Sequence, residues 1–331
     1  MTETQVIGID LGGTAIKLGR FGKDGTCHQF LTVPTPQPAT PKAVVDVMTE
    51  TILLAQRSAF DVGDSRNSTF SQNIPKPDLS GPPAPIDNTG DIQAIGIGVP
   101  GPTDAQGRIS KVAINLTDWR EVPLAEWLEE KTGLPVVIAN DANCAGLGEA
   151  WLGAGSQFRN MIMLTLGTGV GGAIILDGKL FVGHQGAAGE LGLITLNPDG
   201  PPCNSGNNGS LEQYVSVQAI RRATGKEPLE LANLALAGDR FALEFWQDYG
   251  RLLGAGLANL IYVLTPEAVI IGGGVSAGAE LFLPMAKKEI ERRVLSSSRL
   301  GLQLLTAKLG NQAGIAGAAK LAWTKLGNNF K

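Results

Sequence analysis

Cysteine is scarce in this chain, which has three cysteines among 331 residues. Cys27, Cys144 and Cys203 are widely spaced and odd in number, so the paired framework of a small disulfide-rich protein is excluded. A reducing compartment suits such a chain, and the cytoplasm is the simplest choice.

An excess of positive charge is also missing, because 27 lysine and arginine residues stand against 31 aspartate and glutamate residues. The net charge of -4 and the pI near 5.4 give no overall attraction to nucleic acid or to an anionic membrane, so neither is an expected partner. No apolar run approaches the roughly 20 residues that a membrane helix requires. The first residues, Met1–Gln5, have no basic region, which argues against a signal peptide.

Glycine, in contrast, is abundant, with 44 residues where about 7% of a chain is usual. Most of the glycines gather in short clusters at the ends of apolar runs, which is typical of turns that hold a ligand. The length allows two domains of about 150 residues, each with its own core.

The most informative stretch is Val6–Gly19, an apolar strand that ends at Asp10, a Gly-Gly-Thr turn and a second apolar strand. We expect Gly12 and Gly13 to take positive φ and to bring their N–H groups close to an anion. Thr14 adds a hydroxyl donor, and Asp10 can hold a Mg²⁺ ion that bridges phosphates. The stretch predicts a hairpin whose turn holds a phosphate.

A similar pattern returns at Met161–Gly178, with the turn Gly167-Thr168-Gly169 between two apolar strands. Either copy alone can be an ordinary hairpin whose glycines only turn the corner. The two copies together favour a duplicated domain that clasps a polyphosphate chain.

The first half continues with a third strand near Cys27–Val33 and a helix over 42–56. Residues 57–91 are rich in Pro, Ser, Asn and Gly, and we expect a mobile surface insertion or a loop that binds a partner. Order resumes with a strand from Ile92, followed by a loop over Val112–Trp119 that carries Asn115.

A buried strand over Pro135–Ala139 ends at Asn140 and Asp141. Ligands of α/β sheets bind at the carboxyl ends of strands, so Asp141 is placed for chemistry. The alternative is that Asp141 only caps the helix that follows over 142–151.

In the second half, a glycine-rich loop over 183–193 carries Glu190, and a helix begins near Glu212. Helices are expected over 229–237 and 239–264. The strand Ala268–Ile271 then leads through a glycine turn into a helix, an arrangement that offers backbone donors to a nucleotide.

Taken together, these motifs resemble those of the ROK family of sugar kinases, within the actin, Hsp70 and hexokinase superfamily. Asp10–Thr14 and Leu166–Gly172 are similar to the two phosphate motifs, and Ile271–Ser276 to the adenosine motif. Asn140–Asn143 and Gly189–Gly192 resemble the sugar-binding motifs.

The resemblance implies an α/β protein with the two-lobed, actin-like ATPase fold, a duplicated ribonuclease H-like fold in which helices flank mixed sheets. Residues 1–139, with the insertion at 57–91, would form the N-terminal lobe, completed by a C-terminal helix over 312–331. Residues 140–311 would form the C-terminal lobe. The family usually forms homodimers or homotetramers, and one of these is expected here.

The resemblance also implies a glucokinase that transfers the γ-phosphoryl group of Mg-ATP to the 6-hydroxyl of glucose. Asp141 would be the general base, and Asp10 would hold Mg²⁺ through water. The sugar would be bound by Asn115, Asn140, Asp141, Glu190 and Glu212. ATP would be bound by Gly12, Gly13, Thr14, Lys17, Gly167, Thr168, Gly169, Gly273, Gly274 and Val275.

Two details depart from the family pattern. Many members bind a structural zinc ion through a histidine and three cysteines, but Leu193 stands at the histidine position and Cys203 is the one cysteine kept. We therefore expect no structural zinc. In the first hairpin Ala15 follows the Gly-Gly-Thr turn and the lysine is Lys17, as in the polyphosphate glucokinases of the same family.

These departures leave alternatives open. The phosphoryl donor can be polyphosphate instead of ATP, and the sugar can be fructose, mannose or an N-acetylhexosamine. A non-catalytic sugar-sensing regulator is a further alternative. Such regulators carry a DNA-binding helix-turn-helix ahead of the first phosphate motif, whereas five residues precede Val6 here.

Overall fold

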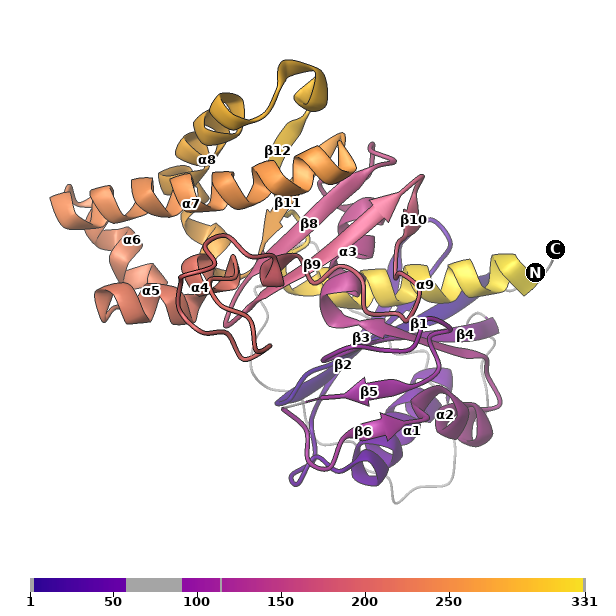
Figure 1. Cartoon of the computed structure of the whole chain (residues 1–331). Helices are drawn as coiled ribbons and strands as arrows, with labels where there is room; N and C mark the ends of the chain where they lie inside the picture. The colour runs from indigo at the N-terminus through magenta and orange to yellow at the C-terminus, as the bar shows by residue number, and fades with distance from the viewer. Residues whose placement is uncertain (1–2, 58–90, 114, 330–331) are drawn as a thin grey trace.

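The computed structural model describes residues 3–57, 91–113 and 115–329. The interior of the expected insertion, residues 58–90, lies outside the described residues. The described chain forms two mixed sheets of five strands each with helices around them, which confirms the predicted α/β fold class (Figure 1). Within these ranges no helix is long and apolar enough to cross a membrane.

The first sheet has the strand order β3-β2-β1-β4-β7. Its strands are β1 (Thr4–Leu11), β2 (Ala15–Phe21), β3 (Cys27–Pro34), β4 (Asp91–Val99) and β7 (Val136–Asn140). Tight turns join β1, β2 and β3, which are therefore antiparallel, whereas the connections to β4 and β7 contain helices and leave those strands parallel to β1. The register of the first hairpin places Asp10 opposite Lys17.

The second sheet repeats this plan in the order β10-β9-β8-β11-β12. Its strands are β8 (Met161–Leu166), β9 (Val170–Leu176), β10 (Lys179–Leu180), β11 (Ala268–Gly272) and β12 (Gln303–Thr306). Again the first three are antiparallel and the last two run parallel to β8. The expected repetition of the layout in the second half is confirmed.

Successive side chains of β1 point to opposite faces of the first sheet, and each face is covered by different helices. Ile7 and Ile9 pack on one face against α1 (Pro41–Arg57) and α2 (Leu124–Thr132), whereas Val6 faces α9 (Ala313–Asn329) on the other. In the second sheet, Ile162 and Leu164 face a core built largely by α7 (Arg240–Leu264) and α8 (Ala279–Arg293). Shorter helices complete that side: α4 (Glu212–Val215), α5 (Val217–Thr224) and α6 (Pro228–Leu236).

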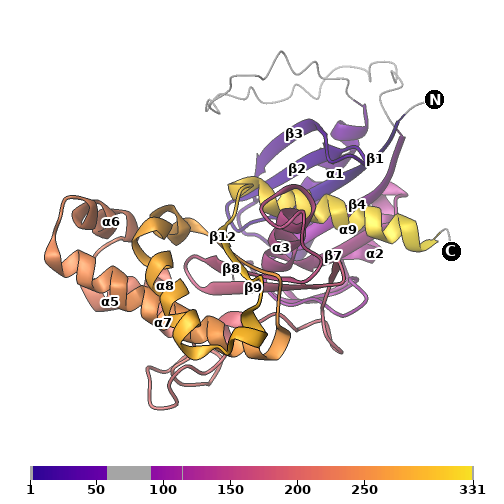
Figure 2. The ribbon, with the colours of Figure 1, turned by 90° about the horizontal axis from the view of Figure 1, so that it is seen from above.

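Two helices lie between the sheets (Figure 2). Helix α3 (Asp141–Leu152) packs on β8 and β9 of the second sheet and on α9, which in turn covers β1 and β4 of the first. We propose the lobe division expected from the sequence, residues 1–139 with the C-terminal helix against residues 140–311. The packing of α9 on the first sheet supports it.

Several short elements were not predicted. The segment expected to be a loop with Asn115 is framed by the paired strands β5 (Ser110–Val112) and β6 (Arg120–Val122). Strand β12 and helix α5 were also missed. Strands of three or four residues are too short to show an alternating pattern, so tertiary pairing defines them.

Candidate active site

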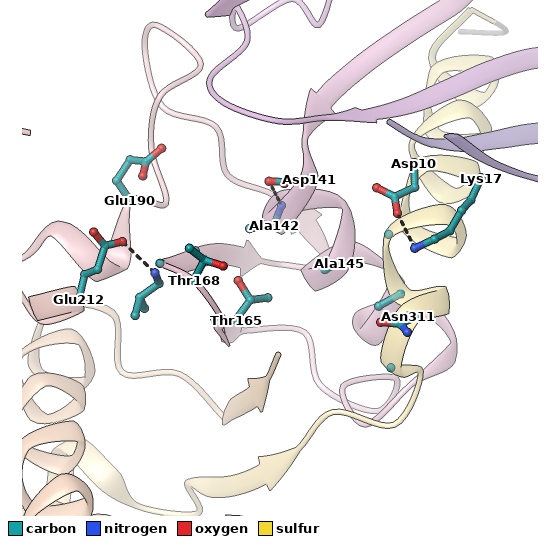
Figure 3. A pocket seen from close by; sticks show the side chains of 17 residues that line it. Asp10, Lys17, Asp141, Ala142, Ala145, Thr165, Thr168, Glu190, Glu212 and Asn311 are labelled. Carbon is teal, nitrogen blue, oxygen red and sulfur yellow. Dashed lines mark hydrogen bonds and ion pairs between the residues drawn. The ribbon is translucent and has the colours of Figure 1, made fainter. Parts of the chain in front are cut away.

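A pocket of about 490 Å³ brings together polar residues from both sheets. It is lined by Asp10, Lys17, Asp141, Ala142, Ala145, Thr165, Gly167, Thr168, Gly169, Val170, Gly171, Glu190, Glu212, Gly310, Asn311, Ala313 and Gly314. Figure 3 shows Asp10 and Lys17 on one side, Glu190 and Glu212 on the other, and Asp141 between them. Eight of the site residues predicted from the sequence line this pocket: Asp10, Lys17, Asp141, Gly167, Thr168, Gly169, Glu190 and Glu212.

The Asp10 side of the pocket is built by the first hairpin and the start of α9. The cross-strand register brings Lys17 Nζ to 3.3 Å from Asp10 Oδ2, and both side chains are partly buried. Gly314, in the first turn of α9, packs so closely that a Cβ atom there would lie 3.3 Å from Asp10 Cγ. This side therefore presents a carboxylate next to an ammonium group.

Asp141 lies where β7 passes into α3. The helix cap is the preceding residue, Asn140, whose Oδ1 accepts hydrogen bonds from the N–H groups of Ala142 and Asn143 at 2.9 and 3.2 Å. Asn140 Nδ2 donates to the carbonyl oxygen of Gly101. The N-cap position that was the alternative for Asp141 thus belongs to its neighbour. Asp141 Oδ1 also accepts a hydrogen bond from the N–H of Ala142 at 2.8 Å, and the Asp141 side chain lines the pocket.

The electrostatics of the pocket are dominated by carboxylates. Asp141 is exposed to the pocket but enclosed by its walls, and this partial burial raises the pKa of Asp141 above its ordinary value, with the negative charge of Asp10 adding to the rise. Burial likewise raises the pKa of Glu190, and the charges of Asp141 and Glu212 add to it. Such a cluster can accept hydrogen bonds from several hydroxyl groups and can remove a proton from one of them.

The turn between β8 and β9 is held by Glu212. The N–H of Gly167 donates to the carbonyl oxygen of Gly169 at 2.9 Å, which closes the turn, and Glu212 Oε2 accepts from the N–H of Val170 at 2.9 Å. A Cβ atom at Gly169 would lie 2.6 Å from Glu212 Oε2, so a larger residue there would have to displace this carboxylate. Glu212 therefore links the second phosphate turn to the pocket.

The turn of the first hairpin lies outside the lining of this pocket. The expected positive φ at Gly12 and Gly13 is wrong, since neither residue takes the left-handed conformation. Gly12 is needed for space instead: its N–H donates to the carbonyl oxygen of Ala15 at 3.0 Å, and a Cβ atom would lie 3.0 Å from the same oxygen. Thr14 belongs to the same turn, and Asn115 is exposed next to Gly13.

The glycine turn after β11 lines a different cavity. Gly274 and Val275 border a pocket of about 200 Å³ whose walls are mainly apolar and include Trp246 and Leu281. Gly273 has φ +84°, and a Cβ atom there would lie 2.4 Å from the carbonyl oxygen of Leu166, at the end of β8. The adenosine motif therefore packs directly against the strand that leads to the second phosphate turn.

Among the lining residues that sequence reasoning did not select are Thr165, Asn311 and Gly314. Thr165 could have been found, because it is the one polar residue in the otherwise apolar strand β8. The sequence carried no comparable signal for Asn311 and Gly314, because folding brings them to the pocket from the segment just before α9 and from its first turn.

The loop that precedes Glu212 is held by hydrogen bonds from Asn207. Its Nδ2 donates to Thr195 Oγ1 at 2.8 Å and to the carbonyl oxygen of Leu193 at 3.3 Å. Among residues 3–57, 91–113 and 115–329, no group of three or more His, Cys, Asp or Glu side chains could hold a metal ion. The expectation that no structural zinc is bound stays a prediction.

Comparison with known proteins bears on the family. A model described as the ROK family matches residues 85–325. The chain belongs to the ROK family. It is 36% identical to a glucokinase of Streptomyces coelicolor over 340 residues, which cover 96% of each chain. The resemblance drawn from the motifs is thereby confirmed.

Solved structures of ROK proteins share the fold. A ROK hexokinase from Thermus thermophilus is similar with a TM-score of 0.80 and 31% identity, covering 98% of this chain and 100% of the other. A ROK family glucokinase from Streptomyces griseus, solved with glucose and AMPPNP, gives a TM-score of 0.72 and 34% identity, covering 97% and 99%. The two-lobed, actin-like fold of these sugar kinases is therefore the fold of this chain.

The family also contains regulators. The xylose repressor of Bacillus subtilis is 32% identical over 232 residues, which cover 69% of this chain and 60% of the repressor. Because kinases and regulators share this fold, only the residues of the main pocket can distinguish a catalytic protein from a sugar-sensing one.

Proposed function

We propose that this protein is a hexose kinase that transfers the γ-phosphoryl group of ATP to the 6-hydroxyl of glucose. The observation that carries the proposal is the position of Asp141 between the Asp10–Lys17 pair and the two carboxylates Glu190 and Glu212. This arrangement has a side suited to phosphates, a side suited to hydroxyls, and a base between them. The glucokinase relatives support it.

In the proposed reaction, Asp141 accepts the proton of the sugar 6-hydroxyl as that oxygen attacks the γ-phosphorus. The new O–P bond forms while the bond from the γ-phosphorus to the bridging oxygen of ADP breaks, and ADP leaves with that electron pair. Phosphoryl transfer needs mainly positioning, charge stabilisation and one base aimed at the nucleophile. The raised pKa of Asp141 makes it a stronger base for this proton.

The donor phosphates would lie along the turns Gly12–Thr14 and Gly167–Gly169, whose backbone N–H groups suit anions, with Lys17 adding a positive charge. The apolar cavity beside Gly273, Gly274 and Val275 would take the adenine ring. Asp10 fits a Mg²⁺ site, since a carboxylate oxygen in the pocket is the kind of hard ligand that this ion prefers. Bound with the nucleotide, Mg²⁺ neutralises charge on the phosphates.

The sugar would lie on the Glu190 and Glu212 side. Carboxylates that accept hydrogen bonds from neighbouring hydroxyls discriminate well between epimers. Asn115 and Asn140 are the further proposed sugar ligands, although both polar atoms of the Asn140 side chain already bond to the backbone. Leu193 stands where many relatives have a histidine, so fructose, mannose and N-acetylhexosamines remain second candidates as acceptors.

The test is formation of hexose 6-phosphate by the pure protein, with glucose as acceptor and either Mg-ATP or polyphosphate as donor. We expect turnover with Mg-ATP. Turnover with polyphosphate alone would refute ATP as the donor and agree with the position of Lys17. No product with either donor, for glucose and for a panel of other hexoses, would refute the kinase and favour a sugar-sensing regulator.

The pH dependence follows from the direction of the pKa shift. Because the pKa of Asp141 is raised, this base becomes protonated at a higher pH than an ordinary aspartate. We expect kcat to fall as the pH drops through that raised pKa and to be constant above it, until another group titrates. A pH profile at saturating substrates measures this limb, and an acid limb at or below the ordinary pKa of aspartate would contradict the assignment.

We further propose a cytoplasmic protein that forms a homodimer or homotetramer, without nucleic-acid or membrane partners. The acidic net charge argues against nucleic-acid and membrane partners, and the glucokinase relatives agree with a cytoplasmic enzyme. Light scattering on the purified protein tests the oligomeric state, and a monomer at all concentrations would refute it.

A further inference from the structure

Glu149 is a fully buried carboxylate to which the proposed reaction gives no role. It lies near the end of α3 with 0% of its surface exposed. Its Oε2 accepts a hydrogen bond from the N–H of Ala154 at 2.7 Å, and its Oε1 accepts from the N–H groups of Lys308 and Leu309 at 2.9 and 2.7 Å. Three backbone donors offset the cost of burying this carboxylate.

The backbone held by Glu149 leads directly into the wall of the main pocket. Lys308 and Leu309 precede the short helix η4 (Gly310–Gln312) and then α9. Gly310, Asn311 and Gly314 all line the pocket, and a Cβ atom at Gly314 would lie 3.3 Å from Asp10 Cγ. Figure 3 shows Asn311 on the same side of the pocket as Asp10 and Lys17, and away from Glu190. This wall therefore belongs to the side of the pocket proposed for the donor.

Helix α3 also carries Asp141 as its first residue. Helix α3 thus carries the proposed base, Asp141, at its beginning. Near its end it carries Glu149, which holds the Lys308–Gly314 wall of the pocket. The helix is also clamped to α9, because a Cβ atom at Gly148 would lie 2.2 Å from the carbonyl oxygen of Ala313.

We infer that Glu149 is a positioning residue that fixes the loop Lys308–Gly314 relative to Asp141 and thereby sets the geometry of the donor side of the pocket. This inference rests on the proposed kinase function. It predicts that loss of the Glu149 carboxylate weakens binding of the phosphoryl donor and leaves binding of the sugar unchanged.

A control carboxylate is present in the same chain, although it is exposed whereas Glu149 is buried. Glu267 also fixes a distant loop through its carboxylate, with Oε2 accepting from the N–H groups of Arg159 and Asn160 at 2.8 Å each. Those residues lie just before β8 and outside the pocket lining. Glu149 accepts through both of its oxygens, so Glu149→Gln removes an acceptor next to the pocket. Glu267 accepts through Oε2 alone, and glutamine would keep that one acceptor, so the control substitution is Glu267→Ala, which removes the bonds away from the pocket.

For Glu149→Gln, we expect faster hydrogen exchange at the backbone amides of 308–314, a KM for Mg-ATP raised about tenfold and a glucose dissociation constant equal to that of the wild type. We expect Glu149→Asp, which keeps the charge, to recover part of the loss. For Glu267→Ala, we expect faster exchange at 159–160 with both constants unchanged. ATP binding is also measured by calorimetry, so that one arm does not depend on turnover.

An unchanged ATP affinity in Glu149→Gln would overturn the inference, and so would equal losses of ATP and glucose affinity, which indicate a general loss of structure. If Glu149→Gln does not fold, Glu149→Asp carries the same comparison. A wild type that phosphorylates no hexose would refute the proposed function. The exchange and ATP-binding arms would still decide whether Glu149 positions the loop.

Discussion

Asp141→Asn is expected to lower kcat for hexose phosphorylation by about 10²–10⁴-fold, because the amide cannot accept the proton of the attacking hydroxyl. The KM for the sugar should change little, since the amide keeps the size of the side chain and one acceptor oxygen. Removing a negative charge from a pocket that also holds Asp10 and Glu190 relieves repulsion, so the melting temperature should not fall. Loss of turnover with undiminished stability is the expected signature, measured by a coupled assay and thermal denaturation.

Asp177→Asn is the matched control for this substitution. Asp177 is exposed in the turn between β9 and β10 and has φ +51°, a conformation that asparagine also tolerates. We expect wild-type turnover from it. Full activity of Asp141→Asn, or an equal loss in both variants, would show that Asp141 is not the base.

Gly317→Ala is expected to destabilise the protein by about 3 kcal/mol or more. Gly317 lies in α9 where this helix crosses α3 backbone to backbone. A Cβ atom there would lie 1.6 Å from the carbonyl oxygen of Cys144 and 2.8 Å from the backbone nitrogen of Gly148. Both neighbours are backbone atoms of a packed helix, so one of the helices must move. Urea unfolding of the purified variant measures the loss.

Gly327→Ala provides the control on the same helix. A Cβ atom at Gly327 would meet nothing within 4 Å. We expect a gain of up to about 1 kcal/mol in the free energy of unfolding, because alanine is the better helix former. Equal stabilities of the two variants would contradict the close crossing of α3 and α9. A Gly317→Ala protein that fails to accumulate in soluble form, while Gly327→Ala does, would agree with it.

Much of the fold could be predicted because its signals are local. The continuous apolar run Val6–Ile9 identifies β1 as a strand with two covered faces, and a similar hairpin near Met161 indicates the duplication. Asp141 could be selected because a polar residue directly after a buried strand lies at the edge where ligands bind. These arguments need only the spacing of residues along the chain.

Other features depend on residues that are far apart in the sequence. Glu149 holds Lys308 and Leu309 across about 160 positions, and Asn311 reaches the pocket from the segment just before α9. The conformation of Gly12 was predicted wrongly for a related reason: glycine allows positive φ, but it equally allows close approach, and the surrounding chain decides which is used.

The sequence by itself therefore determined the class of fold, the two glycine-rich hairpin turns and the family, because each follows from local pattern and residue type. The proposed roles of the turns and of Asp141 were also predicted from such patterns. Only the tertiary structure decided that Asn140 rather than Asp141 caps α3, that Glu212 supports the second turn, and that the Lys308–Gly314 loop forms a wall of the pocket. These features are hydrogen bonds and close contacts between segments that are far apart in the sequence. The spacing of residues along the chain does not show which distant segments will meet, so these contacts could not be predicted from it.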